Sequence, residues 1–220
     1  MNETWTILQQ NLGTALWDTA KMVFISGFIG VVFGTIIGLL LYYYANPLFA
    51  PHPLVNSVAG FVINAIRSLP FLILMVVLIP FAKFVAGDPY TPLGGAVSLS
   101  VAAIPFFARL AEGAFADIDA GVVEAARSTG ANFWLTFQEV LFPEALPALI
   151  RGVVLTLISL LGYSAMVGTI GAGGIGDLAI QYGYNRYNTG VLISVIVILI
   201  VIVQIVQWCG DRLADHYTRS

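Results

Sequence analysis

Charged side chains are scarce in this chain of 220 residues: Asp, Glu, Lys and Arg make up 10% of it, against roughly a quarter in soluble domains. The single cysteine, Cys209, cannot form an internal disulfide. The two histidines, His52 and His216, lie too far apart in the sequence to suggest a metal site. The net charge of -3 leaves no basic patch for nucleic acid. We therefore expect no metal, no internal disulfide and no nucleic-acid partner.

Lysine is rarer still, because it occurs only as Lys21 and Lys83, each time after alanine. A nucleotide-binding P-loop needs Gly-Lys-Ser or Gly-Lys-Thr, so the sequence excludes one. Gly171, Gly173 and Gly176 fit the pattern Gly-x-Gly-x-x-Gly, but they follow a predicted membrane helix and not a strand. A dinucleotide site requires the strand, so we expect no cofactor. Titratable side chains do not gather at one depth, which argues against an enzyme with catalytic residues of its own.

Apolar residues are abundant: hydrophobic side chains make up 59% of the chain, and the mean hydropathy is +0.91. A helix that spans a membrane needs about 20 mostly apolar residues, because its backbone polar groups must be satisfied within the segment. The candidate spans are residues 22–44, 54–81, 93–107, 146–170 and 189–207. The sequence thus predicts an all-α integral membrane protein with about five transmembrane helices and a single domain, residues 1–220.

Glycine and proline mark particular places in these spans. Gly30, Gly34 and Gly38 recur every four residues and share one helix face, where another backbone can approach closely. We expect that partner within the same chain, with a second subunit as the alternative. Pro70 predicts a kink in the second span. Before the first span, apolar side chains recur at helical spacing in residues 5–16, which predicts a short amphipathic helix in the membrane interface, or else a frayed tail.

Residues 117–143 form a polar stretch between the third and fourth predicted spans. Asp117 and Asp119 can cap a first short helix, and Gly130 can end that helix in a left-handed conformation. Asn132 can cap a second helix, which Pro143 then bounds. The stretch therefore predicts two short helices outside the membrane, separated by a break.

This stretch resembles the EAA loop of the permeases of ATP-binding-cassette (ABC) importers. In that loop, Glu-Ala-Ala, three residues, Gly and nine residues precede Ile-x-Leu-Pro. The residues in register here are Glu124, Ala125, Ala126, Gly130 and Pro143. Val140 and Phe142 stand at the Ile and Leu positions, and both are still apolar. The resemblance implies that the residues in register belong to a cytoplasmic coupling loop, which sits in a groove of an ATPase subunit.

Four other segments look like the methionine-uptake permeases of that family, in the expected order: residues 67–70, 142–147, 162–166 and 171–176. This resemblance implies a homodimer of this chain, two cytoplasmic ATPase subunits and an extracytoplasmic methionine-binding protein. ATP hydrolysis would take place on the partner, since this chain has no P-loop. The membrane lipid is the remaining partner that the composition implies.

The orientation follows from the basic residues that flank the EAA-like loop: Arg109, Arg127 and Arg151. If this loop faces the cytoplasm, five spans place the N-terminus outside and the C-terminus in the cytoplasm of a multi-pass inner-membrane protein. Arg67 is then expected toward the inner end of the second span. A snorkelling anchor at the inner membrane edge is the simpler explanation for Arg67, and a substrate contact is the alternative.

The translocation pathway is expected near Tyr163, Ser164 and Met166, because six glycines gather from Gly162 to Gly176. Irregular backbone at membrane depth is tolerated only where it is buried in protein or lines a wet cavity. In similar permeases this region lines the pathway, so we expect a gate here, together with Arg67. For Met166, ordinary core packing is an open alternative.

The sequence therefore predicts the permease subunit of an ABC importer for methionine, as the D or L isomer, or for a related amino acid. Another small compound as substrate remains an alternative. An ion-coupled secondary transporter is a further alternative, but such a protein is expected to carry an acidic residue or a histidine inside the membrane. The most apolar spans contain neither.

Overall fold

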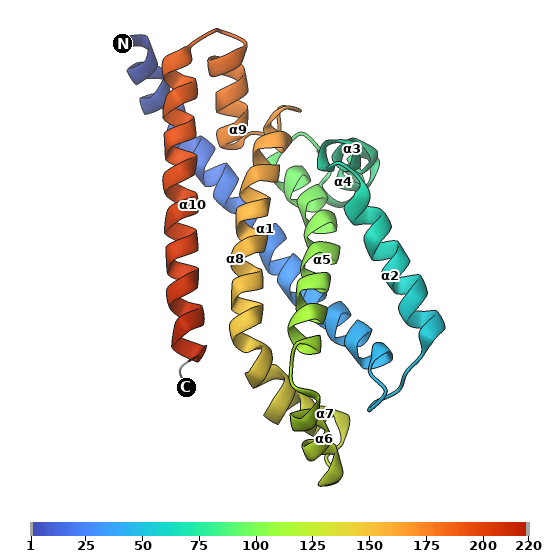
Figure 1. Cartoon of the computed structure of the whole chain (residues 1–220). Coiled ribbons are helices and arrows are strands. Elements are labelled where there is room, and N and C mark those ends of the chain that lie inside the picture. Colours follow the sequence, from blue (N-terminus) through green and yellow to red (C-terminus); the bar gives the residue numbers. More distant parts are fainter. Residues whose placement is uncertain (1, 219–220) are drawn as a thin grey trace.

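The computed structural model describes residues 2–218, and these residues form helices and no strand (Figure 1). Four helices are long and apolar enough to cross a membrane: Glu3–Ala45, Pro92–Ala116, Phe133–Gly168 and Thr189–Tyr217. A bent pair of helices, Pro53–Ser68 and Phe71–Val77, is long and apolar enough only when taken together, as a broken span or a re-entrant loop. The prediction of an all-α membrane protein is confirmed, with one of the five predicted spans broken instead of continuous.

The helix α1 (Asn2–Ala45) is continuous over 44 residues and crosses behind α8 and α5 (Figure 1). The prediction of a separate amphipathic helix before the first span is therefore wrong. Leu8, Leu12 and Leu16 pack with Ile175 and Val191 in one apolar cluster. These leucines are thus partly covered by protein, whereas Trp5 stays 64% exposed, and α1 continues without interruption.

The most extensive helix contact joins α1 to α5 (Pro92–Ala116). A Cβ atom added to Gly34 would lie 2.9 Å from the Cβ of Phe107, and one added to Gly38 would lie 2.6 Å from the carbonyl oxygen of Ala108. Real side chains do not approach so closely, so glycine is needed on this face. The predicted partner within the same chain is confirmed, and it is α5.

The second predicted span is broken between α2 (Pro53–Ser68) and α3 (Phe71–Val77), whose axes differ by 103°. Leu69 is extended, with φ -78° and ψ 132°, because the ring of the following Pro70 disfavours helical backbone at the preceding residue. The prediction of one kinked helix over residues 54–81 is therefore wrong. α3 and the following α4 (Ile79–Ala86) lie at the N-terminal end of α5 (Figure 1).

Pro143 does not end a helix, contrary to the prediction. The π-helical segment η1 (Phe137–Leu141) precedes it and runs directly into α8 (Phe142–Gly168). Proline lacks an N–H and its ring crowds the carbonyl four residues back. Directly after η1, the N–H of Phe142 bonds to the carbonyl of Phe137, five residues back. This wider turn relieves the crowding at Pro143. The helical path from the polar stretch into the membrane is therefore uninterrupted.

After α8 the chain folds back as α9 (Gly174–Leu178) and the π-helical η2 (Ala179–Tyr184), and then enters α10 (Thr189–Thr218). A Cβ on Gly168 at the end of α8 would overlap the backbone of the α9 segment. The turn is thus held between α1 and α8, which agrees with the expectation that glycine-rich backbone here is buried in protein.

Candidate functional site

The predicted coupling segment is a small lobe beyond the ends of α5 and α8, formed by α6 (Ala120–Ser128) and α7 (Phe133–Thr136) (Figure 1). The carboxylate of Asp119 accepts a hydrogen bond from a backbone N–H in the first turn of α6, at 2.8 Å. The amide oxygen of Asn132 does the same for α7, at 2.9 Å. Gly130 lies between the helices with φ +86°. Three of the five predicted helix signals, Asp119, Gly130 and Asn132, are confirmed.

Asp117 was predicted as a further cap of α6, and this prediction is wrong. Asp117 is the C-cap residue of α5, directly after Ala116, and its backbone N–H bonds to the carbonyl of Gly113. The carboxylate of Asp119 alone caps α6, since it lies one residue before the helix. The connection between α5 and α6 is therefore very short, and it holds the lobe close to the end of α5.

The residues of the EAA-like motif lie on α6, which is anchored by one fully buried side chain, Val123 (1% exposed). Glu124 and Ala125 are exposed, and Ala126 is half-buried. Because alanine side chains are short, another protein can approach the helix backbone closely here. The structure thus brings Glu124, Ala125 and Ala126 together on a small exposed helix, with Gly130 just beyond its end. Pro143 lies apart from them, in the first turn of α8.

Arg127 holds the break between α6 and α7 together. Its Nη1 donates a hydrogen bond to the carbonyl of Ala131 at 2.8 Å, across Gly130. The guanidinium carbon also lies 5.5 Å from the centre of the Phe49 ring. Phe49 belongs to the connection between α1 and α2, so one side chain both closes the loop and joins it to another part of the chain.

Three aromatic rings extend this junction: Tyr43 of α1, Phe49 of the following connection and Phe133 of α7. The rings of Tyr43 and Phe133 meet edge to face at 4.6 Å, and those of Phe49 and Phe133 at 5.1 Å. Such pairs contribute about 0.5–1.5 kcal/mol each beyond their buried area. The cluster could not be predicted from the sequence, because its members are spread over 90 positions and carry no shared motif. The coupling segment and the end of α1 therefore form one packed unit.

Large apolar side chains are exposed on and beside the coupling segment: Val122, Trp134, Leu135 and Phe142. Trp134 is 60% exposed, and its ring stacks on Phe137 at 5.4 Å. Exposed apolar groups on an otherwise polar lobe are typical of a surface that contacts another protein. The sequence pattern did not reveal these residues.

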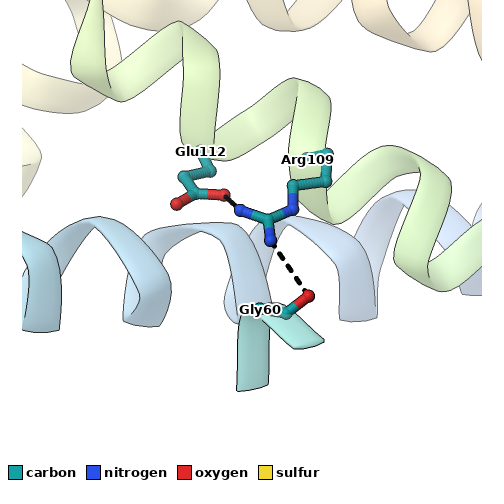
Figure 2. Close-up of polar contacts among 3 residues, drawn as sticks. All are labelled: Gly60, Arg109 and Glu112. Carbon is teal, nitrogen blue, oxygen red and sulfur yellow. Dashed lines mark hydrogen bonds and ion pairs between the residues drawn. The ribbon is translucent and has the colours of Figure 1, made fainter. Parts of the chain in front are cut away.

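A polar contact ties α2 to α5 near this end of the molecule (Figure 2). Arg109 Nη1 lies 2.6 Å from a carboxylate oxygen of Glu112, and Arg109 Nη2 donates to the carbonyl of Gly60 at 3.1 Å. The side chains of Arg109 and Glu112 are 26% and 18% exposed, respectively. Sequence analysis placed Arg109 as a flank of the loop. It did not predict that Arg109 would bond across 49 positions to α2.

The break between α2 and α3 opens a cavity of about 150 Å³, whose lining includes Arg67, Phe71, Phe106 and Tyr163. The rings of Phe71 and Tyr163 stack at 4.7 Å with an angle of 13°. Arg67 therefore lies level with Tyr163, near the end of α8 that is distant from the coupling segment. The prediction that Arg67 lies toward the inner end of its span is wrong, because Arg67 lies in the last turn of α2, beside Tyr163 and away from the coupling segment.

The other two predicted pathway residues do not line this cavity. Ser164 is 1% exposed, and its hydroxyl donates to the carbonyl of Leu161 at 2.8 Å within α8. Met166 is 41% exposed. The structure thus brings Arg67 and Tyr163 together and keeps Ser164 and Met166 apart from them.

The arrangement is that of a membrane helix bundle with a small helical lobe at one end and a broken helix beside a cavity that Arg67 lines. Residues 30–219 match the family described as binding-protein-dependent transport system inner membrane component, and the chain belongs to this family. It is a multi-pass membrane protein and a transport permease component.

Relatives extend the similarity over most of the chain. A probable D-methionine transport system permease protein, MetI, of Vibrio cholerae is 42% identical over 216 residues, which are 96% of each chain. A methionine import system permease protein, MetP, of Bacillus subtilis is 43% identical over 161 residues, 73% of this chain and 72% of that one. Among solved structures, a chain of the inward-facing MetNI methionine ABC transporter superposes with a TM-score of 0.91 at 39% identity, over 96% of this chain and 97% of that chain.

Proposed function

We propose that this chain is the permease subunit of an ATP-driven importer that carries methionine, or a closely related amino acid, into the cytoplasm. The observation that carries this proposal is the similarity to named methionine permeases over nearly the full length of the chain. The capped and exposed α6, with its EAA-like residues, supports the same conclusion independently.

We propose that the assembly contains two copies of this chain, two ATPase subunits and an extracytoplasmic methionine-binding protein. The similar solved structure is that of an ABC transporter, which supports an ATPase partner. The exposed Trp134 and Leu135 beside α6 suit contact with such a partner. The coupling segment would then face the cytoplasm, with the N-terminus outside and the C-terminus inside.

The proposed mechanism transmits force from α6 to the membrane helices. When the ATPase subunits close, they would pull the segment that contains Glu124, Ala125, Ala126 and Gly130. Because Arg127 and Phe133 join this segment to Phe49 and Tyr43, the pull would reach the end of α1. Because α7, η1 and α8 follow one another without a break, it would also reach α8, in whose first turn Pro143 lies. This chain thus supplies the translocation pathway and transmits the movement to its membrane helices. ATP hydrolysis on the ATPase subunits supplies the free energy.

The proposed pathway runs past the outer part of α8, where Tyr163, Ser164 and Met166 lie, and includes Arg67. Tyr163 and Arg67 already line a cavity. Ser164 would have to release the carbonyl of Leu161 before its hydroxyl could meet a substrate. Met166 is exposed and flexible, as a gate that separates at each cycle requires.

The test is uptake of labelled methionine into vesicles that contain this chain, its ATPase and its binding protein. We expect uptake that requires ATP hydrolysis inside the complex and that unlabelled methionine suppresses. Suppression by another amino acid in place of methionine would redirect the substrate assignment. Uptake driven by an ion gradient without ATP would contradict the proposal and favour a secondary transporter.

A further inference from the structure

No described residue, from 2 to 218, forms an ion pair or hydrogen bond with Arg67 of α2. Its guanidinium carbon lies 6.0 Å from the centre of the Phe106 ring. Arg109, by contrast, is paired with Glu112. A positive charge in a membrane-spanning segment is costly unless it reaches water or an anion. Arg67 therefore has hydrogen-bond donors available for another molecule.

These donors border the cavity at the break between α2 and α3. The volume of this cavity is about 150 Å³. The walls are apolar apart from Arg67 and the Tyr163 hydroxyl: Phe71, Phe106 and Tyr163 line the space together with aliphatic side chains. The stacking of Phe71 on Tyr163 joins the start of α3 to the outer part of α8. One cation thus lies beside apolar rings, between two of the elements that border the proposed pathway.

The chemistry of this cavity fits one end of a free amino acid. A guanidinium group presents a planar set of N–H donors that matches the two oxygens of a carboxylate. Aromatic rings accept an apolar or thioether side chain, because sulfur and aromatic groups attract each other. A snorkelling anchor needs neither the cavity nor the aromatic walls.

We propose that Arg67 binds the α-carboxylate of the imported amino acid during its passage, while Phe106 and Tyr163 contact its side chain. This inference rests on the proposed import function and deepens it, because it assigns the polar contact between substrate and permease. It also gives the break at Leu69 and Pro70 a role, since a continuous helix would not leave this cavity beside Arg67.

The test compares Arg67→Gln with Arg67→Lys in the full complex, reconstituted in vesicles and supplied with methionine-loaded binding protein. Labelled methionine imported and ATP hydrolysed are measured on the same sample, and their ratio is the readout. A charge-assisted contact is worth about 1.5–3 kcal/mol, so we expect the ratio to fall at least about tenfold in Arg67→Gln and by less in Arg67→Lys. Arg212→Gln is the control, because Arg212 also lies over an aromatic ring, that of Trp208, but lines no part of the cavity.

A second variant separates charge from structure. Arg67→Cys in a Cys209→Ala background can be modified with aminoethyl or sulfonatoethyl methanethiosulfonate, which adds a positive or a negative charge, respectively. We expect only the positive reagent to restore methionine import per ATP. An unchanged ratio in Arg67→Gln would overturn the proposal, and so would a parallel loss of import and ATP hydrolysis that neither reagent reverses. If the unmodified complex imports no methionine, the proposed function itself fails, and the carboxylate site fails with it.

Discussion

Replacing Glu112 with glutamine removes the carboxylate that faces Arg109 while keeping nearly the same shape. The guanidinium of Arg109 would then lie partly buried between α2 and α5 without a negative partner, and its bond to the carbonyl of Gly60 would have to carry the contact alone. We expect this change to loosen α2 from α5 and to lower the thermal stability of the protein.

The expected size follows from how far the pair is exposed. Removing one partner of a fully buried ion pair costs about 3–5 kcal/mol, whereas an exposed pair contributes about 0–1 kcal/mol. Arg109 and Glu112 are 26% and 18% exposed, so the pair lies between these limits. The amide oxygen of glutamine still accepts a hydrogen bond. We therefore expect the free energy of unfolding to fall by about 2 kcal/mol. For a chain of this length, this corresponds to roughly 4–8 °C in Tm.

The assay is thermal unfolding of the purified protein in detergent, followed by the fraction that remains monodisperse in size-exclusion chromatography. The matched control is Asp215→Asn, because the pair between Arg151 and Asp215 is longer, at 3.8 Å, and its side chains are 54% and 60% exposed. We expect the control to shift Tm by less than about 3 °C. Equal shifts in the two variants, or no shift in Glu112→Gln, would refute the assignment of this contact as the tie between α2 and α5.

Three further changes test the coupling segment and the pathway. Gly130→Arg places a side chain at φ +86°, so we expect the complex to assemble but to hydrolyse ATP without import; normal uptake with normal ATP hydrolysis would exclude Gly130 from the coupling surface. Ser128→Cys in a Cys209→Ala background should react with impermeant thiol reagents from the cytoplasmic side only, and reaction from outside would reverse the proposed orientation. Met166→Trp should block labelled methionine uptake with little change in assembly, whereas uptake at the unmodified rate would leave Met166 as a packing residue.

Local features of this protein were predictable from its sequence, because they depend on neighbouring residues. Asp119, Gly130 and Asn132 set the ends of α6 and α7 through hydrogen bonds and backbone conformation within a few positions. The face of Gly30, Gly34 and Gly38 was likewise readable from helical spacing alone, although only the structure identifies α5 as the helix that packs on it.

Features that depend on tertiary contacts were not predictable in this way. A proline in an apolar run can kink a helix, break it or be absorbed, and the surrounding packing decides the outcome. Pro70 breaks its span by 103°, whereas Pro143 is absorbed by a π-helical turn, and the sequence predicted neither. The contact between Arg109 and Gly60 and the position of Phe49 against Arg127 both join segments that are far apart in the sequence. The position of Arg67 was misjudged because it depends on the break at Pro70.

The central claim is that the ATPase acts on this chain through α6, and site-directed cross-linking tests it most directly. A cysteine at the exposed Ala125, in a Cys209→Ala background, would carry a photoreactive maleimide in the assembled complex. The control is a cysteine at Lys83 on α4, which lies at the opposite end of the molecule from α6 (Figure 1). We predict that position 125 cross-links to the ATPase and that position 83 does not. Cross-linking from position 83 alone, or from neither position in a complex that imports methionine, would contradict the account.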